Sequence, residues 1–98
     1  MTPNNSEADG IAPPLPYDHV LFTDLDGLEG VLVDLNTKKY YQLNETASLV
    51  WRALQRGTPI PDIAKEMTEL YDVTIEHARL SVEGALQRFA AQKLLRPH

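Results

Sequence analysis

The sequence has no cysteine, only three histidines, and no Lys or Arg before residue 38. Without cysteine the chain cannot form a disulfide, a thiolate metal site or a cysteine nucleophile. The histidines His19, His77 and His98 lie far apart in the sequence and do not make up a metal-binding set, and we expect His19 to be a solvent-facing strand residue. The sequence therefore predicts neither a metal nor another cofactor.

Long apolar runs are also missing. No segment approaches the length of a membrane-spanning helix, and the N-terminus lacks the charged region and apolar region of a signal peptide. The 98 residues, 43% of them apolar, are enough for one small domain with a single core. We therefore expect a soluble, unprocessed, cytoplasmic protein with no membrane partner.

Charge is unevenly distributed along the chain. Residues 1–37 hold seven acidic residues and no basic one, whereas residues 38–98 hold nine basic and seven acidic residues, a net of +2. Nucleic-acid binding generally needs a clustered basic surface, which this distribution does not provide. The sequence therefore predicts no nucleic-acid partner.

The first residues differ from the rest in composition. Residues 1–16 contain four of the prolines among small and polar residues, a composition that cannot bury enough apolar surface to offset the entropy of ordering it. We expect a flexible tail over residues 1–16 and a single domain over residues 17–98.

Three segments show the two-residue period of a half-buried strand: Asp18–Leu25, Val31–Leu35 and Lys39–Leu43. Asp26 and Gly27 predict a two-residue hairpin turn between the first two segments, and residues 36–38 predict a turn between the second and third. In the third segment Lys39, Tyr41 and Leu43 share one face while Tyr40 and Gln42 share the other. We expect Leu43 to anchor this strand in the core.

Helical signals follow the third strand without a spacer. Asn44 is suited to cap a helix that begins at Glu45 and ends before Gly57, and Trp51 on its apolar stripe is expected to lie in the core. A second helix begins near Pro59 or Pro61, with Ile63, Met67 and Leu70 predicted to be buried.

Thr74 is predicted to cap a third helix over residues 75–91, whose buried face consists of Ala78, Val82, Ala85, Leu86 and Phe89. Gly84 inside this helix could allow close packing. A three-stranded antiparallel sheet followed by three helices predicts an α+β fold of the winged helix-turn-helix type.

The residues that catalysis requires do not occur together in this sequence. Asp24 and Asp26 are two apart at a turn, and Glu66 and Glu69 belong to a face that is expected to be solvated. We find no nucleophile with a base, no paired catalytic carboxylates and no phosphate-binding glycine loop. The sequence therefore predicts that the chain is not an enzyme.

Most of the chain, roughly residues 18–95, resembles the PqqD-like family of small peptide-binding domains. The resemblance rests on the run YYQLNETASLVWRAL and on the later run IAKEMTELYDVTIEHARLSVEGALQRFAAQKLL, including its Tyr-Asp-Val at residues 71–73. It implies a recognition element for ribosomally made, post-translationally modified peptides. Relatives deliver precursor peptides to radical SAM enzymes, or to lasso-type proteases and cyclases, and the sequence does not indicate which.

The resemblance, together with the physics of an edge strand, predicts that a leader peptide adds itself to the third strand and rests on the final helix. The residues expected to bind it are Lys39, Tyr40, Tyr41, Gln42, Arg79, Val82, Glu83 and Leu86. The alternative is a winged helix-turn-helix DNA-binding or regulatory protein. That alternative is weakened by the final helix, which sets Arg79 and Arg88 against Glu76 and Glu83 and has no net charge.

Overall fold

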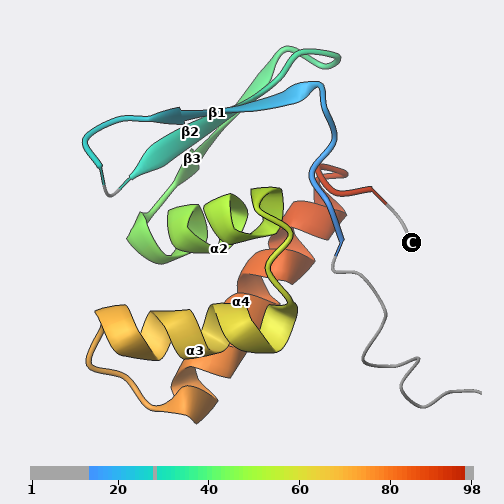
Figure 1. Cartoon of the computed structure of the whole chain (residues 1–98). Helices are drawn as coiled ribbons and strands as arrows, with labels where there is room; N and C mark the ends of the chain where they lie inside the picture. Colours follow the sequence, from blue (N-terminus) through green and yellow to red (C-terminus); the bar gives the residue numbers. More distant parts are fainter. Residues whose placement is uncertain (1–13, 28, 97–98) are drawn as a thin grey trace, which may run out of the picture.

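The computed structural model describes residues 14–27 and 29–96, which form a sheet followed by three helices. The elements are β1 Val20–Asp24, β2 Gly30–Asp34, β3 Lys39–Leu43, α2 Glu45–Gln55, α3 Ile60–Leu70 and α4 Ile75–Ala91. The sheet lies against one side of α2 and α3 lies on the other side, while α4 runs diagonally across both helices (Figure 1). This arrangement confirms the predicted α+β fold. None of the described helices has the length and apolar content needed to cross a membrane.

The sheet has the order β1-β2-β3 with both pairs antiparallel, so β1 and β3 form its two edges. The connection between β1 and β2 is longer than the predicted two-residue turn. Asp24 accepts the N–H of Gly27 at 2.6 Å, and the N–H of Leu25 donates to the carbonyl of Glu29 at 2.9 Å. Gly27 itself has a φ of 91°, a conformation that favours glycine.

The turn between β2 and β3 is organised by Asp34, which is buried. Its Oδ1 accepts the N–H groups of Asn36 and Thr37 at 2.9 and 3.2 Å. Burial alone would raise the pKa of Asp34, but these two hydrogen bonds and the nearby His19 outweigh it and hold the pKa below its usual value. Lys38 completes the turn with a φ of 66°.

The helix caps follow the sequence prediction. Asn44 Oδ1 accepts the N–H of Ala47 at 2.9 Å, and Thr74 Oγ1 accepts the N–H of His77 at 3.1 Å, so each side chain satisfies a free donor of its helix. At α3 a proline occupies the first turn, where a missing N–H costs no hydrogen bond.

The core lies where the three helices meet the inner face of the sheet. Trp51 is fully buried, as predicted, and its ring meets the Phe89 ring edge to face with the centroids 5.2 Å apart. Leu32 and Leu43 bring β2 and β3 into the same cluster, which confirms Leu43 as the anchor of its strand. The predicted inner face of α4 is also confirmed, with Leu86 half-buried at its margin.

Three expectations differ from the structure. Leu70, predicted to be buried, is 63% exposed because α3 ends there and its last turn extends past the core. His19 lies in the turn before β1, half-buried, with its ring stacked on Tyr17 and its Nε2 3.7 Å from Asp34 Oδ1. A side chain at Gly84 would meet only Arg88, at an ordinary 3.7 Å, so this glycine is not required for close packing.

The first described residues pair with the end of the chain. Pro16 forms a β-bridge with Leu95, and Arg96 donates its N–H to the carbonyl of Leu15 at 2.7 Å. The predicted flexible tail falls mainly on residues 1–13, which lie outside the described residues. Its last residues, 15 and 16, therefore take part in the fold, and the division of the chain at residue 16 stays a prediction.

Candidate functional site

The hydrogen bonds of β2 show which of its backbone groups point toward β3. The N–H of Leu35, just after β2, donates to the carbonyl of His19 on the β1 side at 2.9 Å. The carbonyl of Asp34 accepts the N–H of Lys38 on the β3 side at 2.7 Å. Because successive residues of a strand direct their backbone groups to opposite sides, Leu32 also bonds toward β3.

The alternation continues into β3 through the register. Lys39, Tyr41 and Leu43 are paired with residues of β2 that bond toward β3, so their own N–H and C=O groups are used inside the sheet. The N–H and C=O groups of Tyr40 and Gln42 therefore point out of the free edge. Neither N–H has a hydrogen-bond partner among the described residues. β3 thus presents two unpaired donors that a further strand could use.

The side chains of β3 divide between two faces as the sequence predicted. Leu43 is buried and Tyr41 is half-buried against the core, whereas Lys39 on the same face is exposed. Tyr40, on the outer face, is 74% exposed, and Gln42 beside it is exposed as well. The four residues predicted on β3 therefore lie together along one free edge.

The predicted residues of α4 do not lie with them. Arg79, Val82 and Glu83 line a separate hollow of about 300 Å³ whose other wall comes from α3. Arg79 also forms ion pairs on its own helix with Glu76 and, at 2.8 Å, with Glu83. The residues predicted from the sequence thus lie in two places, the edge of β3 and the hollow between α3 and α4. The sequence does not indicate which exposed side of α4 faces the sheet.

A different part of α4 lies beside β3. Lys39 and Tyr41 line an open hollow of about 620 Å³ together with Ala91, Gln92 and Lys93, at the end of α4. Arg88 precedes Ala91 by three residues and Gln92 by four, so helix geometry places it on the same side of α4. We refer to the space bounded by Lys39, Tyr41, Arg88, Gln92 and Lys93 as the β3–α4 groove.

Arg88 and Arg79 lie on opposite sides of α4, because a separation of nine positions corresponds to about two and a half helical turns. The sequence analysis did not assign Arg88, Gln92 or Lys93 to the site. Glu76, Arg79 and Glu83 lie on one side of the helix and Arg88 lies on the other. Only the tertiary structure shows which of these sides faces β3.

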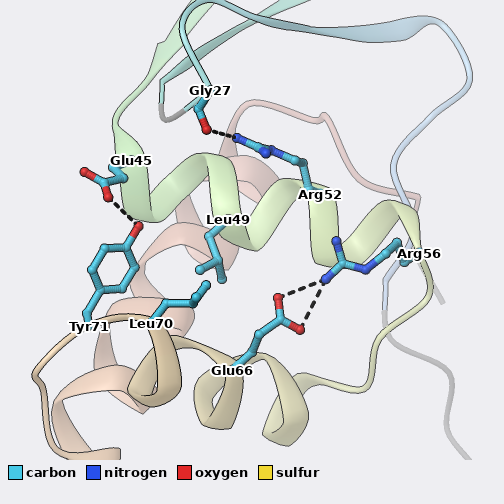
Figure 2. Close-up of a pocket in the computed structure, with 8 residues that line it drawn as sticks. All are labelled: Gly27, Glu45, Leu49, Arg52, Arg56, Glu66, Leu70 and Tyr71. Atoms are coloured by element: carbon cyan, nitrogen blue, oxygen red, sulfur yellow. Dashed lines mark hydrogen bonds and ion pairs between the residues drawn. The ribbon is translucent and has the colours of Figure 1, made fainter.

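A further cavity, of about 170 Å³, lies between α2, α3 and the β1–β2 hairpin (Figure 2). Two pairs of its polar groups are matched to one another: Arg56 pairs with Glu66 at 2.9 Å, and Tyr71 donates to Glu45 at 2.7 Å. Burial and that hydrogen bond raise the pKa of Tyr71 to about 12. Arg52 donates to the carbonyl of Gly27 at 3.3 Å. These contacts join the helices to the hairpin, and we interpret the cavity as structural.

The described residues offer no metal site, since they contain no group of three or more His, Cys, Asp or Glu side chains suitable for an ion. The DNA-binding alternative gains no support from Arg79 of α4, because this exposed arginine is already paired with two glutamates. The free edge of β3 and the groove beside it are therefore the candidate functional site.

Comparisons with known proteins point to one family. The sequence model described as coenzyme PQQ synthesis protein D (PqqD) matches residues 29–95. The fold is similar to that of TbiB1 in complex with the TbiA(beta) leader peptide, with a TM-score of 0.78 and 25% identity over 86% of this chain and 96% of that one. It is also similar to lasso peptide synthetase B1 complexed with the leader peptide, with a TM-score of 0.77 and 24% identity over 86% and 98% of the two chains. Among curated proteins, none gives a significant match.

Proposed function

Because this chain belongs to the PqqD family, we propose that it is a non-catalytic protein that binds the leader segment of a precursor peptide in the biosynthesis of a ribosomally made, modified peptide. Its family supports this proposal, as does its likeness to a chain of known structure that holds a leader peptide. The cytoplasmic location expected from the sequence belongs to the same proposal.

The peptide adds to the sheet as a fourth strand beside β3. The observation that carries this mechanism is the pair of outward N–H groups at Tyr40 and Gln42, which have no partner among the described residues. Main-chain hydrogen bonds of this kind supply affinity with little dependence on sequence, and pockets for alternate side chains supply specificity. Lys39, Tyr40, Tyr41 and Gln42 are thus the proposed binding residues on the strand.

The helical wall of the site is the side of α4 that bounds the β3–α4 groove. Arg79, Val82, Glu83 and Leu86 were expected to form this wall, but the first three line the hollow toward α3. Leu86 is one turn after Val82 and shares its side of the helix. We therefore propose that Arg88, Gln92 and Lys93 meet the peptide instead. The bound precursor is then presented to a modifying enzyme, either a radical SAM protein or a lasso-type protease or cyclase.

Amide hydrogen exchange and chemical shifts test the mechanism. The probe is the N-terminal region of a precursor peptide encoded beside this chain, titrated into ¹⁵N-labelled protein. We expect the amides of Tyr40 and Gln42 to exchange at least about tenfold more slowly in the complex, because each gains a buried hydrogen bond. Shifts that cluster on α2 and spare both β3 and α4 would contradict strand addition even if the peptide binds.

A further inference from the structure

We propose that the β3–α4 groove selects peptides with an acidic residue two positions away from an apolar one. This inference rests on the proposed function and adds to it the chemical class of the peptide. It is carried by the unpaired basic side chains that lie together at the groove and by the aromatic surface of Tyr41 beside them.

Three of the four arginines outside the groove are paired with acidic side chains. Arg56 pairs with Glu66 at 2.9 Å, Arg96 pairs with Asp18 at 3.0 Å, and Arg79 pairs with two glutamates of its own helix. Their charges are therefore already balanced in the folded chain.

The basic residues of the groove have no such partners. Among the described residues Lys39, Arg88 and Lys93 form no ion pair. Lys39 and Lys93 line the same hollow at one end of β3. Arg88 lies one turn earlier on α4, with its guanidinium near the surface of Gly84. Two unpaired positive charges thus line the hollow and a third lies on the same side of α4, although the chain as a whole carries a net charge of −5.

Asp34 is the acidic residue that lines this hollow, and it does not neutralise the basic side chains of the groove. Asp34 directs Oδ1 at the N–H groups of Asn36 and Thr37, and the same oxygen lies 3.7 Å from His19. Its charge is therefore engaged inside the β2–β3 turn, and it forms no ion pair with Lys39 or Lys93. A peptide that enters the groove meets a positive potential, which attracts carboxylates and repels basic side chains.

Strand geometry gives the spacing of the expected residues. Residues opposite one another on neighbouring strands have side chains on the same face, so the peptide residues opposite Lys39 and Tyr41 both face the groove. They are two positions apart in the peptide. The residue opposite Tyr41 meets an aromatic, half-buried surface and is apolar, and the residue opposite Lys39 is Asp or Glu.

Selection from a displayed library of random 12-residue peptides tests the inference without a known ligand. The full chain is the bait, and peptides that also bind the Gln42→Pro variant are removed. We expect the remaining peptides to share an acidic residue two positions from an aliphatic or aromatic one. If peptides that bind the full chain but not Gln42→Pro lack acidic residues, this inference is overturned and the proposed function is not. If no peptide depends on Gln42 in this way, the proposed function is overturned and this inference with it.

Charge reversal on the protein gives the second test. A fluorescein-labelled peptide from the selection is titrated into Lys39→Glu and Arg88→Glu, with Lys65→Glu as the matched control, because Lys65 is an exposed, unpaired cation on α3 outside the groove. We expect each groove variant to bind about tenfold more weakly and the control to bind within about twofold of the original protein. Replacement of the peptide's acidic residue by Lys should restore binding to Lys39→Glu. Equal affinities across all variants, with circular dichroism showing intact folds, would overturn the inference.

Discussion

The two edges of the sheet are similar in shape but differ in how their polar groups are used. An open hollow lies beside each edge, of about 780 Å³ at β1 and about 620 Å³ at β3. At β1 the outward N–H of Val20 donates to the carbonyl of Tyr17 at 3.1 Å, and the nearby Arg96 pairs with Asp18. The other two outward donors of β1 and both outward donors of β3 have no partner among the described residues, but the cations that border β3 form no ion pair. Neither pocket size nor unused backbone donors therefore distinguish the two edges, whereas the unpaired charges beside β3 do.

The largest expected effect comes from removing an outward donor at each edge in turn. Proline at Gln42 leaves the β2–β3 hydrogen bonds intact but deletes a donor on which the added strand depends. We expect peptide affinity to fall by about ten- to a hundredfold, measured by fluorescence anisotropy with a peptide selected on the full chain.

The matched control is Asp24→Pro, which removes an outward N–H from the edge formed by β1. It also removes the side chain that accepts from Gly27, so some loss of stability is expected, but peptide affinity should stay within about twofold. If both prolines weaken binding equally, the two edges are not functionally distinct and the assignment to β3 is wrong.

The second prediction concerns the packing that holds β1 in place. A methyl group at Gly30 would come within 2.3 Å of the Phe22 ring, which lies over this glycine. We expect Gly30→Ala to lower the free energy of unfolding by about 1–3 kcal/mol, measured by urea denaturation. Gly84→Ala is the control, because its methyl group meets only an ordinary contact and alanine favours the helix by about 1 kcal/mol. Equal stabilities of the two variants would show that the ring moves aside freely.

The third prediction tests the turn that leads into β3. Since the pKa of Asp34 is lowered in the folded state, its charge stabilises the fold at pH values above the carboxyl's ordinary pKa of about 3.9. This contribution is lost as the pH falls through the lower, folded-state pKa. The melting temperature of Asp34→Asn should therefore lie below that of the original chain at neutral pH, and the gap should narrow below about pH 4.

Asp72→Asn provides the control, because Asp72 is exposed and its side chain forms no hydrogen bond or ion pair among the described residues. Its melting temperature should follow that of the original chain at every pH. A gap for Asp34→Asn that does not change with pH would mean that the side-chain oxygen, and not its charge, supports the turn.

Local sequence signals predicted most of the fold. The caps at Asn44 and Thr74, the alternation in β3 and the burial of Trp51 depend on neighbouring residues and are confirmed. The exposure of Leu70 was not predictable in the same way, because an apolar stripe indicates one face of a helix but not how far the neighbouring elements extend along it.

Of the candidate site, only the part on the strand could be predicted from the sequence. A strand at the edge of a sheet has two faces and one free edge, so the alternation of residues in β3 predicts which side chains share a face. A helix such as α4 has several exposed sides, and its contact with the sheet depends on tertiary packing. From the sequence we therefore predicted Arg79, whose charge is paired within α4, and not Arg88, which lies on the opposite side of the helix.

The smallest expected effect follows from this difference between the two arginines. Arg79 was among the residues that the sequence predicted to bind the peptide. In the structure Arg79 pairs with Glu76 and Glu83 and lines the hollow toward α3, so its charge is balanced and directed away from β3. We now expect Arg79→Glu to change peptide affinity by less than about twofold, because an exposed, paired charge outside the binding groove contributes little to the complex. The loss of two ion pairs should lower the melting temperature slightly, and this decrease would show that the substitution has broken them.

The comparison is made with Arg88→Glu on the same helix and with the same labelled peptide. If Arg79→Glu weakens binding more than Arg88→Glu does, the peptide rests on the α3 side of α4, and the groove assigned here is not the one that binds it.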